Sequence, residues 1–119
     1  MTHRIFSTPV AVVYDLYAKK VVRKGQSVEA MDEIMCWLTQ LSAQQLHALI
    51  DSNTTFEEFF AQVTLNPAAD RISGSICGVK IQEITDPLMK KVRYLDKVVD
   101  EVAQGKSVEK ITSRLLASA

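Results

Sequence analysis

The stretch Asp86–Ala103 reads DPLMKKVRYLDKVVDEVA and carries the longest helical pattern of the chain, so it decides the fold. Asp86 can cap a helix, and Pro87 suits the first helical position because its missing N–H would have no intrahelical partner there. Apolar side chains then recur at steps of three and four, as on one face of an amphipathic helix. These side chains are Leu88, Val92, Leu95, Val99 and Val102. The seam spans about two heptads, fewer than the ~3 to 4 of a coiled coil, so we expect a helix that buries this face in a core.

Similar signals mark other helix boundaries on either side of this stretch. Thr8-Pro9 and Asn66-Pro67 repeat the pairing of a capping residue with proline, and each pair predicts a helix start. Gly25 and Gly105 each follow an amphipathic run and precede a serine by two residues. Glycine tolerates the left-handed residue that ends a helix, and serine opens the next one. Both sites therefore predict a helix, a tight turn and a second helix.

Two short segments have the spacing of a capping box, Ser42 to Gln45 and Thr55 to Glu58. In this motif the side chains at the two ends each satisfy a backbone N–H at the other end. The apolar residues that follow both boxes keep a helical spacing, so we expect two further short helices.

The segment 72–84 supports two interpretations. A helix is favoured by Asn66-Pro67 upstream and by the lack of a partner strand elsewhere in the chain. A strand is favoured by the alternation over 79–82, and Gly74 and Gly78 each weaken a helix by about 1 kcal/mol. We expect a helix, with a short strand or hairpin within 72–84 as the alternative.

These patterns predict an all-α fold, a compact bundle of six or seven short helices that forms a single helical domain over residues 1–119. If 72–84 is extended, the fold class is α+β. The side chains expected in the core are Trp37, Phe56, Phe59, Phe60, Leu88, Val92, Leu95 and Val99.

Composition fits one globular domain. The chain has 119 residues, 47% of them hydrophobic, with 14 basic and 14 acidic side chains, which excludes an intrinsically disordered protein. Two cysteines are too few for a disulfide scaffold. No apolar run has the length of a secretory signal or a membrane span, so we expect a cytoplasmic protein with no membrane partner.

The zero net charge hides an uneven order of charges along the chain. Residues 1–24 hold five basic and one acidic side chain, residues 25–70 hold seven acidic ones and no Lys or Arg, and residues 71–119 hold nine basic and six acidic ones. The three segments thus carry +4, −7 and +3. The basic run KKVVRK at 19–24 could contact phosphates, so a weak nucleic-acid contact through the first helix is kept as an alternative.

Several short strings along the chain together resemble a bacterial family of conserved hypothetical proteins, domain of unknown function 2200. The strings are MTHRIF at 1–6, YDLY at 14–17, CWLT at 36–39, FF at 59–60, ICGV at 76–79, DPLM at 86–89 and RYLDK at 93–97. The resemblance implies a small bacterial protein with no established activity. It therefore supplies no catalytic residue.

The chain offers few residues for metal or redox chemistry. Its Cys and His residues are Cys36, Cys77, His3 and His47, and no two of them form the close pair that structural zinc requires. We therefore expect no metal and no cofactor. Cys36, between Met35 and Trp37, is typical of a buried thiol that acts as a small hydrophobe.

Our first functional hypothesis is a non-enzymatic domain that contacts another protein or its own copy, because the sequence shows no catalytic constellation. The alternative function is that of a small-molecule or anion-binding domain, with enzymatic activity left open. Arginine readily binds carboxylate and phosphate groups, and Arg4 and Arg93 each lie next to other polar or aromatic residues. The candidate ligand-binding residues are His3, Arg4, Tyr17, Cys77, Arg93 and Tyr94.

Overall fold

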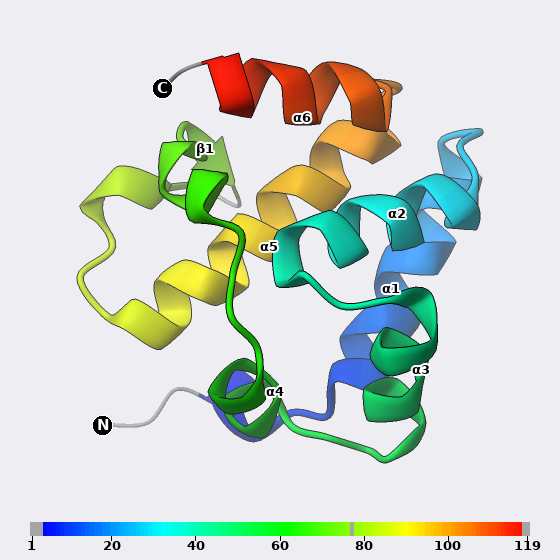
Figure 1. Cartoon of the computed structure of the whole chain (residues 1–119), viewed down its shortest axis with the longest axis vertical. Helices are drawn as coiled ribbons and strands as arrows, with labels where there is room; N and C mark the ends of the chain where they lie inside the picture. The colour runs from blue at the N-terminus through cyan, green and yellow to red at the C-terminus, as the bar shows by residue number, and fades with distance from the viewer. Residues whose placement is uncertain (1–3, 77, 118–119) are drawn as a thin grey trace.

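The computed structural model of the protein describes residues 4–76 and 78–117. In this part of the chain six α-helices are joined by short 3₁₀ turns and one small hairpin (Figure 1). In chain order the elements are η1 (Arg4–Ser7), α1 (Val10–Arg23), α2 (Val28–Thr39), α3 (Ala43–Asp51), α4 (Phe56–Gln62), η2 (Pro67–Arg71), β1 (Ser75–Ile76), β2 (Val79–Lys80), η3 (Ile81–Glu83), α5 (Pro87–Ala103) and α6 (Val108–Ala117). The fold is therefore mostly α, as the sequence predicts.

Helix α5 is the centre of the packing. It contacts α1, α2, α4 and α6 as well as the hairpin strand β1. Figure 1 shows it running across the molecule, with α2 in front of it and α6 across one end. Its start has the expected chemistry: Asp86 accepts hydrogen bonds from the backbone N–H groups of Leu88 and Met89, and Pro87 is the first helical residue. The opening sequence pattern thus identifies the central helix correctly.

The expected turns and capping boxes are confirmed. Gly25 and Gly105 have φ of +83° and +98°, the left-handed region in which a side chain would be strained. Ser27 caps α2 by accepting from Ala30 N. Both capping boxes are complete, at the starts of α3 and α4. These helix ends depend on local chemistry alone, so they could be predicted from sequence.

The start of α1 differs slightly from the prediction. Pro9 precedes the helix, which begins at Val10, and it pairs with Thr55 in an isolated β-bridge. Val10 N donates to Thr54 O at 2.8 Å, and Phe56 N donates to Thr8 O at 3.1 Å. The chain before α1 is therefore hydrogen-bonded to the chain before α4.

The helix favoured for 72–84 is wrong, and the alternative of a short hairpin is confirmed. Strands β1 and β2 pair antiparallel, with Ser75 opposite Lys80 and Ile76 opposite Val79. Gly74 and Gly78 have φ of +96° and +78°, which a helix does not allow. Strand β1 therefore pairs with β2, which lies within the same segment.

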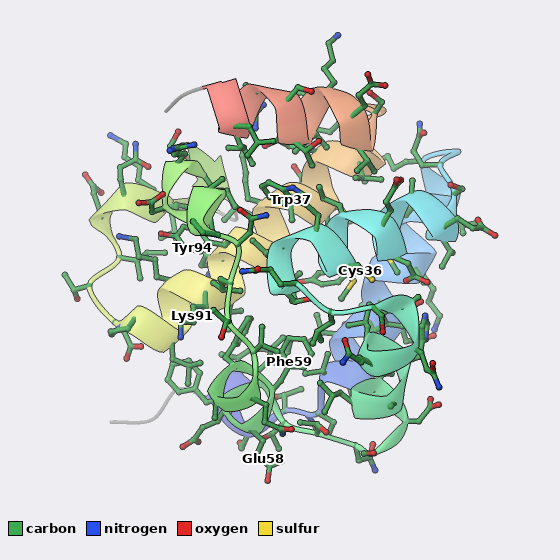
Figure 2. All side chains as sticks on the ribbon, viewed as in Figure 1. Cys36, Trp37, Glu58, Phe59, Lys91 and Tyr94 are labelled. Carbon is green, nitrogen blue, oxygen red and sulfur yellow. The ribbon has the colours of Figure 1, made fainter. Side chains whose placement is uncertain are left out.

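Most of the expected core is buried. Phe56, Phe59 and Leu95 are fully buried, together with several residues of α2: Met31, Ile34, Met35 and Leu38. Figure 2 shows Phe59 directed from α4 toward α2 and α5, whereas Glu58 points away from the molecule. Trp37 and Leu88 are only partly buried, which corrects their predicted place at the centre. Leu88 lies in the first turn of α5 and Trp37 in the last turn of α2, close to the helix ends.

Candidate functional sites

The structure brings together two of the predicted ligand-binding residues, Tyr17 and Arg93. The Tyr17 hydroxyl donates to Asp96 Oδ1, and Arg93 Nη1 donates to Asp96 Oδ2 at 3.0 Å. One turn further along both helices, Lys20 Nζ lies 2.6 Å from Asp100 Oδ1. These contacts join α1 to α5, and an anion approaching Arg93 would compete with the carboxylate of Asp96.

The other predicted residues do not complete this group. Tyr94 is buried on another face of α5, where burial and then the nearby carboxylate of Asp70 raise its pKa. His3 and Cys77 lie outside the described residues, as does the side chain of Arg4. An anion site built from all six residues therefore stays a prediction.

A second polar cluster joins α1, α2 and α3 through Asp32. Tyr14 donates its hydroxyl to Asp32 Oδ1 at 2.6 Å, and His47 Nε2 lies 3.0 Å from Asp32 Oδ2. The rings of Tyr14 and His47 meet edge to face, with centroids 5.6 Å apart. Sequence spacing could not reveal this cluster, because Asp32 and His47 lie on different helices.

Cys36 lies one helical turn after Asp32, on the same side of α2, and is half-buried. Together with Asp32 it lines a largely apolar cavity of about 450 Å³ between α2 and the start of α3. Burial, and then the charge of Asp32, raise the pKa of the Cys36 thiol. A nucleophilic cysteine needs the opposite shift, so this His, Asp and Cys arrangement is not poised for thiolate chemistry.

The cluster predicts alkaline sensitivity. Burial, and then the hydrogen bond to Asp32, raise the pKa of Tyr14 above its ordinary 10.0, and that of Cys36 rises above 9.0. Because the neutral forms are favoured in the folded state, their stabilising effect is complete below pH 9 and is lost as the pH rises further. We expect the free energy of unfolding, measured by urea denaturation, to fall above pH 9. Tyr14→Phe should flatten this fall above pH 10, and an unchanged slope would contradict the assignment.

The outer face of α1 exposes an aliphatic stripe. Val12, Leu16 and Val22 are 51%, 58% and 59% exposed, although each is a large hydrophobic residue. An ion pair lies within the stripe, with Lys19 Nζ 3.0 Å from Asp15 Oδ2. These five residues form the α1 stripe, and a shallow apolar hollow lies near its C-terminal end. Residues lining this hollow are Ala18, Lys19, Val22 and Arg23.

In the described part of the chain, Lys and Arg side chains of the basic ends form no ion pair with the acidic middle segment. The Lys and Arg ion pairs in the described part of the chain use carboxylates of the first and third segments: Asp15, Asp96, Asp100 and Glu101. In residues 4–76 and 78–117 no three His, Cys, Asp or Glu side chains are grouped so as to hold a metal. Among the same residues, every helix is too short or too polar to cross a bilayer.

The fold defines a small, mostly helical protein with one short hairpin. The chain belongs to the family described as uncharacterized protein conserved in bacteria, domain of unknown function 2200, whose model matches residues 4–113. It is similar to the crystal structure of the uncharacterized protein SP1917, with 36% identity and a TM-score of 0.91. That match covers 98% of this chain and 96% of the other. No curated protein matches the chain.

Proposed function

We propose that this protein is a non-enzymatic self-associating domain that forms a two-fold dimer through the α1 stripe. The supporting observation is the row of exposed aliphatic side chains, whose burial would contribute roughly 25 cal/mol for each Å² removed from water. The proposal includes a cytoplasmic location, because a free thiol such as that of Cys36 stays reduced in the cytoplasm.

The charges of the stripe favour an antiparallel pairing of the two α1 helices. With the two-fold axis at the level of position 17 along α1, Asp15 of one copy faces Lys19 of the other, and Val12 faces Val22. A parallel pairing would instead place Asp15 against Asp15 and Lys19 against Lys19, which costs free energy. The sequence of the stripe is therefore self-complementary in one orientation only, as a two-fold interface requires.

The expected dimer is weak. Helix α1 has 14 residues and is about 21 Å long, and its stripe offers much less than the ~800 Å² per partner of a standard interface. Dissociation at micromolar or higher concentrations is therefore expected, and the proposal predicts a reversible equilibrium.

Sedimentation equilibrium from about 1 µM to about 1 mM would test the proposal. The wild-type protein is expected to show a monomer–dimer equilibrium that Leu16→Asp abolishes. Leu116→Asp is the matched control, because Leu116 is 54% exposed but lies on α6. A wild-type protein that stays monomeric throughout, or equal effects of the two variants, would refute the proposal.

A charge swap tests the orientation. Asp15→Lys should weaken the dimer, because it places two positive charges opposite each other across the axis. The double variant Asp15→Lys with Lys19→Asp should restore it, since both ion pairs then form in reverse. Failure of the double variant to recover association would rule out the antiparallel register.

A further inference from the structure

A polar cavity of about 350 Å³ lies where η2, the C-terminal half of α5 and α6 meet. Four separate parts of the chain contribute to its wall, so the cavity depends on the tertiary fold. Its polar lining consists of Arg71, Ser73, Lys97, Glu101, Lys106 and Arg114. Four cationic side chains thus surround one carboxylate, and three positive charges have no counterpart in the lining.

Several donors around the cavity are available to a ligand. Arg71 uses Nη1 to donate to the backbone oxygens of Leu115 and Leu116, at 3.0 and 3.4 Å, and this holds the guanidinium against the end of α6. Lys97 Nζ donates to Ser75 O at 3.2 Å, which fixes its position with further N–H groups to spare. Arg71 and Lys97 are therefore held in place by backbone carbonyls, and neither forms an ion pair with a carboxylate of the described residues.

Glu101 has an unusual environment for a carboxylate. It is 2% exposed, and Arg114 Nη2 donates to its Oε1 at 2.9 Å. Its Oε2 is buried and accepts no hydrogen bond from the described residues, although Arg114 Nη1 lies 2.9 Å and Lys106 Nζ 3.6 Å away. A ligand that entered this cavity would meet an excess of cations and a buried carboxylate oxygen that is ion-paired but accepts no hydrogen bond from the described residues.

We propose that this cavity binds hydrogen phosphate. Its anionic oxygens would accept hydrogen bonds from Arg71, Lys97 and Lys106, and its one P–OH group would donate to Glu101 Oε2. Lys106 covers this oxygen without bonding to it and has a half-exposed side chain, so its ammonium can turn onto a phosphate oxygen. Sulfate has the same shape and charge but no proton at neutral pH, so it could not donate a hydrogen bond to Glu101 Oε2.

Isothermal titration calorimetry at pH 7.5 and constant ionic strength would test the proposal, with inorganic phosphate, sulfate and methyl phosphate as probes. We expect phosphate to bind at least tenfold more tightly than sulfate, because only phosphate donates to Glu101. Methyl phosphate has lost its last proton at this pH, so it should behave like sulfate. Tighter binding of methyl phosphate than of phosphate would overturn the assignment to the free anion.

Matched variants separate the cavity from general charge effects. Lys106→Gln should weaken phosphate binding about tenfold, through loss of a charge-assisted hydrogen bond. Lys110→Gln makes the same charge change on α6 outside the cavity lining and should leave binding unchanged. Glu101→Gln should make phosphate and sulfate bind alike. Equal effects of the two lysine variants, or equal affinity of the wild-type protein for phosphate and sulfate, would overturn the proposal.

Discussion

Phe59→Ala is expected to lower the free energy of unfolding by about 4 kcal/mol. Phe59 has no exposed surface, and its ring meets that of Phe60 edge to face with centroids 5.2 Å apart. It is directed from the short helix α4 toward α2 and α5 (Figure 2), so truncation leaves a cavity between three helices. Domains of this size have roughly 5 to 15 kcal/mol of stability, so the loss is a large part of the total.

Urea denaturation followed by circular dichroism measures this loss. Glu57→Ala, at an exposed position of the same helix, should change stability by less than about 0.5 kcal/mol. Phe59→Leu should fall between the two, at about 1 to 2 kcal/mol, because it keeps most of the apolar volume. A cost of Phe59→Ala close to that of Glu57→Ala would contradict the place of α4 in the core.

Arg114→Met is expected to cost about 2 to 3 kcal/mol. The substitution leaves Glu101 buried with Lys106 Nζ, 3.6 Å from its Oε2, as its one charged partner among the described residues. Removing one member of a buried ion pair typically costs about 3 to 5 kcal/mol, and the figure is reduced here because the Arg114 side chain is 48% exposed. The hydrogen bond from Arg114 to Glu101 also raises the pKa of the guanidinium, so Arg114 is charged at neutral pH.

The double variant Glu101→Met with Arg114→Met distinguishes a stranded charge from lost packing. It should be more stable than Arg114→Met alone, because no buried carboxylate remains. Arg23→Met, at an exposed arginine of α1, serves as the control and should have little effect. If Arg114→Met and Arg23→Met cost the same in urea denaturation, Glu101 does not depend on Arg114.

The helix boundaries could be predicted because their causes are local. Asp86 with Pro87 and the two capping boxes each use side chains within a few residues of the backbone groups they satisfy. The structure of segment 72–84 was harder to predict, because its local sequence pattern is compatible with a helix and with a short hairpin. In the folded protein Gly74 and Gly78 have left-handed backbone angles, which a hairpin accommodates and a helix does not.

The candidate sites were harder to predict than the fold. Tyr17 and Arg93 were singled out for an anion, yet α1 and α5 pack so that both contact Asp96. Arg71 and Arg114 carried no signal in the sequence, because they lie on separate elements that meet only in the folded chain. An isolated arginine has the same local pattern whether it faces water or a cavity.

The sequence by itself determined most of the helix boundaries, which faces are apolar, and that the charge is divided into segments of +4, −7 and +3. Only the tertiary structure decided which charges meet. Contacts over 79 and 80 residues join α1 to α5, and Arg114 lies against a buried glutamate of another helix. The physical reason is one of range: capping and periodicity act over one or two turns, whereas ion pairs and cavities depend on how whole helices pack.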